Sequence, residues 1–338
     1  MGVFVFLPLV LPLTAWPVAR LAELHLHPRT ATRLLTAFAT VMAVCSTFCL
    51  ALLMVVGTAQ LPGNPLPDRW SDPEVRAAVP YDEIAGKAAV PALVLVLAVC
   101  ARTLWRHHRI ARRARRALAG LPASSVVVLP EEKSYAYALP GRPRGRVVVT
   151  TALLRGLIPP ERRALFAHER AHLTARHHRY LLAVRLAARA NPFLRPLRTA
   201  VAFTTERWAD EDAARSVGSR RVVARAIGKA ALLSGAAPAF AGISGFSAFT
   251  DFSGFPGFPG FPGFPGFPGF PGFASAGPVP RRVAALLEPA PVARSWPSVF
   301  TSVGLAAWGA AVGTLVSAMS SANSAVTMFL ILHAATPL

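Results

Sequence analysis

Residues 34–56 read LLTAFATVMAVCSTFCLALLMVV, and this stretch decides the class of fold. It carries no charged residue, and it is long enough to cross the hydrocarbon core of a bilayer, which needs about 20 apolar residues. Shorter apolar runs at 2–18 and 88–104, and the uncharged stretch 295–338, predict three further membrane helices. Prolines within the first run predict a kink there: Pro8, Pro12 and Pro17. The last stretch exceeds one span, and we expect one long helix rather than a pair interrupted at 320–324.

The overall composition agrees with a membrane protein. Hydrophobic residues make up 53% of the 338-residue chain and charged residues only 15%, which is too apolar for an average soluble domain. The formal net charge of +20 is compatible with nucleic acid, anionic lipid or an acidic partner. Much of this charge, however, directly follows the apolar run 88–104, and the sequence contains no nucleic-acid recognition motif. We therefore expect the lipid bilayer as its partner, and no direct nucleic-acid binding.

Arginine placement predicts the orientation in the membrane. A dense series begins at the end of the third apolar run and continues beyond it: Arg102, Arg106, Arg109, Arg112, Arg113, Arg115 and Arg116. The first run is also followed by arginines (Arg20, Arg29 and Arg33), whereas the loop 58–86 after the second run is acidic. Because cytoplasmic loops carry an excess of Lys and Arg, both chain ends are predicted outside the cell membrane and the polar block in the cytoplasm. Arginines beside a span are typical of anchoring on anionic lipid headgroups.

These patterns predict three consecutive blocks: three transmembrane helices in 1–104, a cytoplasmic domain in 105–294 and a C-terminal transmembrane helix in 295–338. Runs of β-branched or alternating residues predict a hairpin or a three-stranded sheet early in the cytoplasmic block: 126–129, 135–139 and 146–150. Helical patterns follow it: about 160–190, 199–217 with Gly218 as its stop, and 220–233. A low-complexity insert at 252–273 repeats the triplet Phe-Pro-Gly, and we expect a largely disordered loop there.

The segment AHERAH, residues 167–172, contains the pattern HExxH. On a helix, residues four apart lie on one face, so the imidazoles of His168 and His172 can bind one Zn²⁺. Glu169 lies next to the first histidine and can reach a water on the metal as a general base. Zn²⁺ brings the pKa of this water toward neutrality, and the carboxylate can take its proton and later pass a proton to the leaving amine.

A catalytic zinc site needs a third protein ligand and an open coordination position. The strongest candidate is Glu206, in the segment ERWAD at 206–210 on the next predicted helix. Asp210 lies one turn further along, so it faces the same way and can accept a hydrogen bond from a ligating histidine. Asp210, Glu211 and Asp212 are alternative ligands.

Two more histidines, His177 and His178, are close in sequence. On a continuous helix they point about 160° and 100° away from the face that carries the HExxH histidines. We therefore expect neither of them to be a ligand, and we place both in a basic patch that faces solvent or lipid headgroups.

The HERAH segment with the downstream ERWAD segment, after three spans and before a last one, resembles the M56 family of membrane metallopeptidases. These are the protease parts of bacterial β-lactam sensor-transducers, and they are related to the M48 peptidases. Residues 137–141 and 146–151 also resemble the hairpin that precedes the zinc helix in those families, and the resemblance covers about 80–290. It implies a set of roles in this sequence: His168, His172 and Glu206 as zinc ligands, Glu169 as catalytic base, and Asp210 as the partner of a ligating histidine.

The resemblance also implies a fold and a target. The fold would be a mainly α membrane protein with about four transmembrane helices and a cytoplasmic α+β zincin-like domain inserted before the last one. The strand at 147–149 would be an edge that pairs with an extended substrate. The substrate would be a cytoplasmic protein, often a repressor whose cleavage releases transcription. Two features depart from the family pattern, because the chain has no SxxK motif and carries the Phe-Pro-Gly insert.

The function that these observations predict is a membrane-anchored zinc metalloendopeptidase that hydrolyses peptide bonds of a cytoplasmic, regulatory protein. The alternative is a non-enzymatic membrane signalling scaffold, in which the zinc site is structural or degenerate. The number of protein ligands distinguishes the two, because a structural site is closed by a fourth protein ligand and a catalytic site is not.

Overall fold

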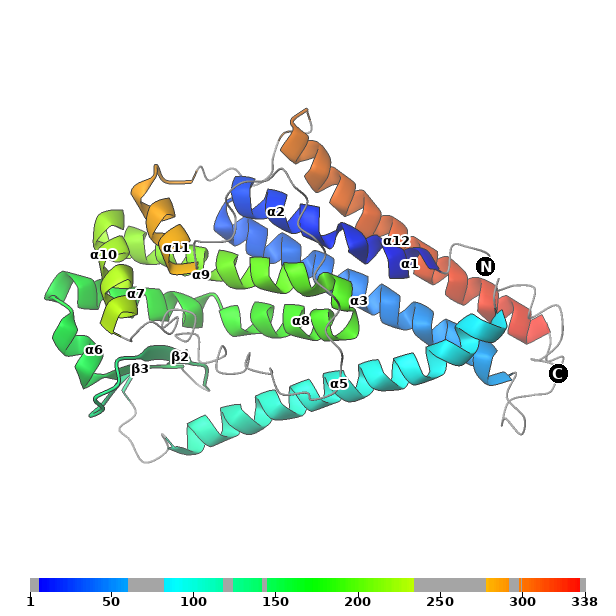
Figure 1. The fold of residues 1–338 in the computed structure, drawn as a ribbon, viewed down its shortest axis with the longest axis horizontal. Helices are drawn as coiled ribbons and strands as arrows, with labels where there is room; N and C mark the ends of the chain where they lie inside the picture. Colours follow the sequence, from blue (N-terminus) through cyan, green and yellow to red (C-terminus); the bar gives the residue numbers. More distant parts are fainter. Residues whose placement is uncertain are drawn as a thin grey trace, which may run out of the picture. The chain divides into compact units, whose positions relative to one another are not determined.

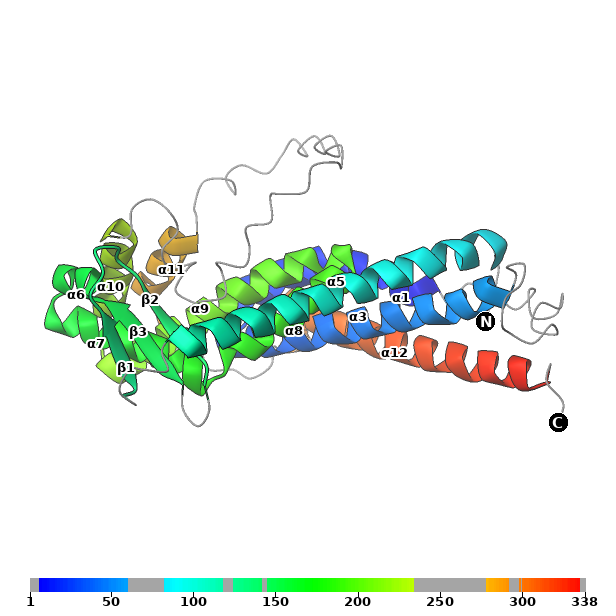
Figure 2. The same cartoon turned by 90° about the horizontal axis from the view of Figure 1, so that it is seen from below.

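The structure, a computed structural model, describes residues 6–59, 82–117, 124–141, 145–233, 278–291, 298 and 300–334. The Phe-Pro-Gly insert at 252–273 lies outside the described residues, as do Asp68, Asp72 and Glu74 of the acidic loop. The described part is mostly helical and includes one three-stranded sheet (Figures 1 and 2).

The chain forms two compact units that interleave along the sequence. We name the first the membrane-helix unit, which comprises Met1–Arg113, Arg179–Thr204 and Val292–Leu338. The second, the sheet unit, comprises Ala114–His178 and Thr205–Pro291. The sequence suggested consecutive blocks, whereas the structure groups residues 179–204 with the apolar helices.

Four helices of the described residues are long and apolar enough to cross a membrane: Leu7–His25, Pro28–Val55, Ile84–Ala114 and Val303–Ala334. The first is broken into α1 (Leu7–Val10), a 3₁₀ turn η2 (Leu11–Thr14) and α2 (Ala15–His25). This break agrees with the kink expected from its prolines. The other three are α3 (Pro28–Ala59), α5 (Asp82–Ala117) and α12 (Ser302–Ala334). As expected, α12 is one continuous helix.

Small side chains allow close packing in the membrane-helix unit. Three alanines of α2 are buried in one core with side chains of α3: Ala15, Ala19 and Ala22. A helical hairpin joins the same core, formed within this unit by parts of α8 (His177–Ala190) and α9 (Arg195–Val217) with the 3₁₀ turn η4 (Pro192–Leu194) between them. Thr32 Oγ1 of α3 donates a hydrogen bond to Thr204 Oγ1 of α9 at 2.9 Å, so this buried polar pair is satisfied.

The sheet unit contains β1 (Val126–Leu129), β2 (Ala136–Leu139) and β3 (Arg146–Thr150) in the order β1-β3-β2. β3 pairs in parallel with β1 and antiparallel with β2. The expectation that the strand at 147–149 is an edge is therefore wrong, since β3 has a neighbour on both sides. Its side chains are buried accordingly, whereas β2 has only β3 beside it among the described strands.

The sheet unit also contains the part of α9 from Thr205 on and four further helices: α6 (Thr151–Gly156), α7 (Pro159–Thr174), α10 (Arg220–Leu233) and α11 (Pro278–Leu287). Apolar side chains of α7, α10 and α11 share one core with β3. Gly218 ends α9 with a φ of 75°, as its sequence position predicted, because glycine adopts the left-handed conformation without steric cost. The sequence patterns did not predict the helices α6 and α11.

The single helix predicted over 160–190 is two helices. α7 ends at Thr174 and α8 begins at His177, because Arg176 adopts a left-handed conformation with a φ of 55°. An arginine in this conformation costs about 1–2 kcal/mol, and no glycine or proline marks the position in the sequence. At its start, α7 is held by Glu161, whose carboxylate accepts from the Ile158 amide at 3.1 Å and pairs with Lys229 at 2.9 Å.

Gly57 of α3 and Gly86 of α5 mark a close backbone approach within the membrane-helix unit. A Cβ added at Gly57 would meet the backbone of Gly86 well inside van der Waals contact. We predict that Gly57→Ala destabilises the protein by about 1–3 kcal/mol, because the two helices must separate. The measurement is the thermal unfolding midpoint of the purified full chain in detergent. Gly309→Ala is the matched control, since a Cβ there meets nothing within 4 Å. Equal midpoints for the two variants would contradict this packing.

Candidate metal centre

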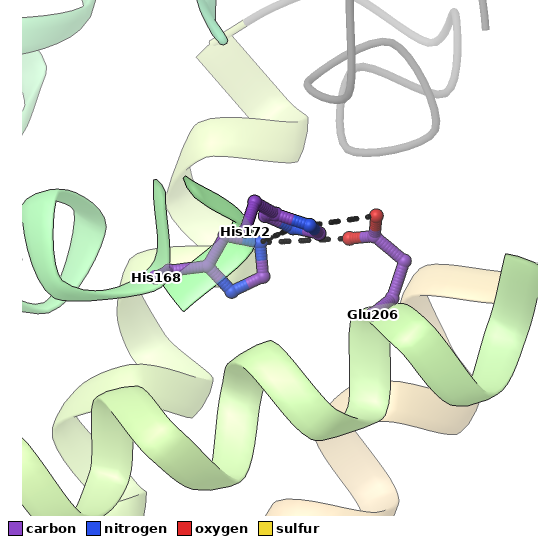
Figure 3. Close-up of side chains that lie close together, drawn as sticks. All are labelled: His168, His172 and Glu206. Atoms are coloured by element: carbon purple, nitrogen blue, oxygen red, sulfur yellow. Dashed lines mark hydrogen bonds and ion pairs between the residues drawn. The ribbon is translucent and has the colours of Figure 1, made fainter. Parts of the chain in front are cut away.

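Two helices of the sheet unit bring three ligand-bearing side chains together. Figure 3 shows His168 and His172 of α7 facing Glu206 of α9. His168 Nε2 lies 3.1 Å from His172 Nε2 and 3.5 Å from Glu206 Oε2. His172 Nε2 lies 3.6 Å from Glu206 Oε1. All three side chains are buried, and the three together form a group that can hold one metal ion.

The spacing of these atoms fits a zinc ion. Bonds of about 2.0–2.2 Å at tetrahedral angles separate zinc ligand atoms by about 3.3–3.6 Å. The separations of 3.1, 3.5 and 3.6 Å lie close to this range. Two imidazoles and one carboxylate are also a donor set of catalytic zinc sites. Within the described part of the chain, the group contains these three ligands and no fourth histidine, cysteine or carboxylate.

Asp210 lies against the other nitrogen of His168. It lies one turn after Glu206 on α9, and its Oδ1 is 3.0 Å from His168 Nδ1. A proton on Nδ1 that points at this carboxylate leaves Nε2 to act as a lone-pair donor. Burial disfavours a charged imidazole, but the hydrogen bonds and charges of Asp210 and Glu206 outweigh it and raise the pKa of His168 to about 9. The carboxylates around His168 therefore stabilise positive charge at this position, and they would stabilise a bound metal cation in the same way.

A buried arginine balances the two carboxylates. Arg282 of α11 donates from Nε to Asp210 Oδ2 at 2.8 Å and from Nη2 to Asp210 Oδ1 at 2.6 Å. Its Nη1 lies 3.0 Å from Glu206 Oε2. Burial tends to raise the pKa of both carboxyl groups, but the charge of Arg282, helped by the histidines, holds each pKa below its ordinary value. Both groups are therefore carboxylates at neutral pH.

The sequence pattern did not identify Arg282. It lies 72 residues after Asp210, beyond the Phe-Pro-Gly insert, and no periodicity links the two positions. Arg220 holds α11 in place by donating to the carbonyl oxygens of Ala285 at 2.6 Å and Leu286 at 3.1 Å. The available signal was an arginine pair inside the short apolar segment PVPRRVAALL, because an arginine buried there needs an acidic partner.

The alternative carboxylates contact other groups. Glu211 accepts from Arg220 Nη1 at 2.6 Å and lies 3.6 Å from Arg207. Asp212 pairs with the exposed Arg215. Asp210 faces Arg282 and one nitrogen of His168. Of the four acids considered from the sequence, Glu206 is the one that reaches the Nε2 atoms of both histidines.

Glu169 is fully buried next to His168. Burial raises the pKa of its carboxyl group to about 8, although the charges of His168 and Arg282 and the backbone of Ala138 on β2 oppose this rise. A group that titrates near neutrality can both accept and donate a proton at physiological pH. A divalent cation held by the neighbouring ligands would lower this pKa and favour the carboxylate.

His177 contacts the nitrogen of His172 that points away from Glu206. The two Nδ1 atoms lie 2.9 Å apart, and the His177 ring packs against Trp208 with 4.6 Å between centroids. Burial and the neighbouring His172 lower the pKa of His177, so its ring is neutral and its Nδ1 can accept a hydrogen bond from His172 Nδ1–H. Burial also lowers the pKa of His172 to about 4. This hydrogen bond favours the His172 tautomer with a lone pair on Nε2.

The expectation that His177 lies in a solvated or headgroup-facing patch is wrong. Its side chain is 1% exposed. The expected angles hold for one continuous helix, whereas the left-handed Arg176 interrupts the helix before His177, whose ring contacts His172. His178 is half-buried and is not part of the metal-binding group.

Comparison with known families agrees with this chemistry. Residues 101–190 match the family model of Peptidase family M48. The matched segment includes His168, Glu169 and His172 and ends before Glu206. It supports an M48-related metallopeptidase, a class that typically depends on zinc, and it does not separately support the M56 family. Searches of curated proteins and of solved structures found no match.

Removal of Arg282 tests the charge balance. We predict that Arg282→Met destabilises the protein by about 3–5 kcal/mol at pH 7, because two buried carboxylates lose their counter-charge. Since both carboxyl pKa values are depressed, the stability that they contribute is present above their ordinary pKa and is lost as the pH falls. The difference in stability between wild type and Arg282→Met should therefore become smaller at acidic pH.

Thermal unfolding of the two proteins across pH measures this effect. The neighbouring Arg281→Met is the control for loss of one positive charge from α11, and we expect a smaller change. Two results would contradict the role of Arg282 as the counter-charge. One is a similar loss of stability in Arg282→Met and Arg281→Met, and the other is a stability difference between wild type and Arg282→Met that grows at acidic pH.

Replacement of His177 tests its support of His172. His177→Phe keeps a ring beside Trp208 but removes the acceptor, and we predict a metal affinity about 10–100-fold weaker. His177→Gln restores an acceptor oxygen and should recover part of the loss. Zinc competition with a chelator measures the affinity, with His178→Gln as control. An unchanged affinity in His177→Phe would show that the hydrogen bond does not matter.

Proposed function

We propose that this protein is a membrane-anchored zinc endopeptidase that cuts a cytoplasmic, regulatory protein. One observation carries the proposal. The Nε2 atoms of His168 and His172 lie 3.1 Å apart, and each lies within 3.6 Å of an oxygen of the Glu206 carboxylate, next to the buried Glu169. The match of residues 101–190 to an M48 peptidase model supports the same reaction class.

Each residue has a defined part in this proposal. His168, His172 and Glu206 hold Zn²⁺, which when bound acts as a Lewis acid that polarises a substrate carbonyl and makes water acidic. Glu169 accepts the proton of the attacking water at its carboxylate and then delivers a proton to the amine that leaves. Asp210 and His177 keep the two imidazoles in the required tautomers, and Arg282 keeps Asp210 and Glu206 ionised.

The ligand count favours catalysis over the structural alternative. A structural zinc site usually has four protein ligands, whereas a catalytic site has three and leaves one position for water or substrate. The group contains three ligands within the part of the chain that the structure describes. The buried Glu169, whose pKa of about 8 suits proton transfer, has no purpose in a purely structural site.

The sheet suggests how a substrate is held. β2 packs beside α7, and the backbone of Ala138 in β2 lies close to Glu169. β2 has β3 on one side and no described strand on the other. An extended peptide that pairs with the free side of β2 would run past Glu169 and the ligands. β2, rather than the strand at 147–149, would therefore be the edge that pairs with the substrate.

The cellular setting rests on the apolar helices and the arginines. Four helices are able to span a membrane, and the basic end of α5 carries exposed arginines: Arg102, Arg109, Arg112, Arg113 and Arg116. Arginine-rich segments beside a span favour the cytoplasmic side. The sheet unit, which begins at Ala114 directly after this segment, would then act on a cytoplasmic protein.

Two substitutions test the proposal. We predict that Glu169→Gln retains one zinc ion per chain but lowers peptidase activity about 10²–10⁴-fold, because the proton acceptor is lost. His168→Ala should lose both zinc and activity. Zinc is measured by elemental analysis of the purified full chain, and activity by cleavage of fluorescein-labelled casein as a general probe.

Comparison of these variants with wild type distinguishes a catalytic zinc site from a structural one. A wild-type protein without stoichiometric zinc would end the proposal. Retained zinc with equal activity in wild type and Glu169→Gln would favour the structural alternative. Arg221→Gln on the exposed face of α10 is the control for preparation and folding, and it should behave as wild type.

A further inference from the structure

The backbone hydrogen bonds of β2 decide which of its polar groups face away from β3. Tyr135, directly before β2, pairs with Thr150 of β3. Its carbonyl oxygen accepts from the Thr150 amide at 3.1 Å, and its own amide donates to Thr150 Oγ1 at 3.1 Å. Hydrogen-bonded and non-hydrogen-bonded residues alternate along an antiparallel ladder, so Tyr137 also turns its polar backbone groups toward β3. Ala136 and Ala138 therefore direct their N–H and C=O groups to the free side of β2.

The pairing of β3 agrees with this alternation. The Val147 amide donates to the Ser125 carbonyl oxygen, directly before β1, at 2.8 Å. Its neighbour Val148, the residue opposite Tyr137, therefore faces β2. A peptide on the free side of β2 would form its hydrogen bonds with the two alanines. Its residue opposite Tyr137 would then occupy a non-hydrogen-bonded position, where the Cα atoms of the two strands are only about 4.5 Å apart.

The side chain of Tyr137 lies on the sheet face that points away from α7. Ala136 is buried in one core with side chains of α7, and successive residues of a strand point to opposite faces. On the other face, Tyr137 packs against the buried Val127 and Val148. Its ring also stacks on Tyr135 with 6.1 Å between the centroids. Both tyrosines are half-buried, so part of each ring is accessible.

A substrate side chain opposite Tyr137 would meet an apolar, mainly aromatic surface. Tyr137 is its direct neighbour, and Tyr135 and Leu139 are its diagonal neighbours on the same face. Diagonal neighbours lie about 7–8 Å away, within reach of aromatic and other long side chains. Cross-strand pairs of aromatic and β-branched residues are favourable, whereas a charged side chain would lose hydration against this surface.

We propose that Tyr137 and Tyr135 form a subsite that selects an aromatic or large aliphatic side chain at one position of an extended peptide substrate. This inference rests on the proposed peptidase function and names the substrate class for the same site. β2 packs beside α7, which carries Glu169 and two of the ligands. A strand on its free side would therefore hold the selected residue at a fixed number of positions from the cleaved bond.

Cleavage-site profiling of the full chain in detergent tests the subsite. The probe is a library of unstructured peptides with randomised positions, and mass spectrometry identifies the products. Wild type should prefer Phe, Tyr or Leu over Ala about 10-fold at one position near the cut, measured as kcat/KM on matched peptides. Cleavage without such a position would overturn the subsite alone. Absence of all cleavage by the zinc-loaded protein would overturn the proposed function and the subsite with it.

Variants assign the preference to the tyrosines. Tyr137→Thr removes the ring but keeps a residue suited to a strand, and it should lower the Phe-to-Ala ratio to about 2 or less with zinc content retained. Tyr137→Phe keeps the ring and should keep the ratio. The control is Val128→Ala, an exposed position on β1 at the other edge of the sheet, which should also keep the ratio.

Two results would overturn the role of Tyr137 in selection: an unchanged ratio in Tyr137→Thr, or an equal loss in Val128→Ala. Thermal unfolding of each variant reports whether it folds. If Tyr137→Thr is unstable, Tyr135→Ala decides the question. This residue precedes the strand, and its loss should lower the ratio about 2- to 5-fold, because one diagonal neighbour is removed. An unchanged ratio in Tyr135→Ala would then overturn the proposal.

Discussion

The contact of Arg282 with Asp210 and Glu206 is the interaction on which the candidate metal centre depends. Two carboxylates and two imidazoles are buried together, and burial of such groups is unfavourable unless their charges are balanced. Arg282 supplies the positive charge, and it arrives on α11 from a distant part of the sequence. Arg220 in turn fixes α11 by two backbone carbonyls and pairs with Glu211 of α9. The ionisation of the site is thus coupled to the packing of α11.

The backbone contributes a second constraint. The left-handed Arg176 interrupts the helix that carries the HExxH pattern and brings His177 into contact with His172. A conformation that is costly for arginine is consistent with a functional position, because strain persists where the surrounding contacts determine the backbone. Each histidine of the motif then has its own partner, Asp210 for His168 and His177 for His172. Both partners contact Nδ1 of a ring whose Nε2 faces Glu206.

Much of this arrangement follows from local sequence patterns. Apolar runs predicted the four apolar helices, because each run is close to the length that a helix needs to cross a bilayer. Helical periodicity placed His168 with His172, and Glu206 with Asp210, since each pair is separated by one turn. Long-range features were beyond these patterns. The central position of β3 depends on pairing with two strands at once, the break at Arg176 lacks a glycine, and Arg282 reaches its partners only through tertiary packing.

X-ray absorption at the zinc edge of the purified full chain tests the central claim most directly. The account predicts one zinc ion coordinated by two imidazole nitrogens and by oxygen at about 2.0–2.2 Å, with no sulfur in the coordination shell. A sample that binds no zinc, or a spectrum that requires a sulfur ligand or a third imidazole, would contradict it.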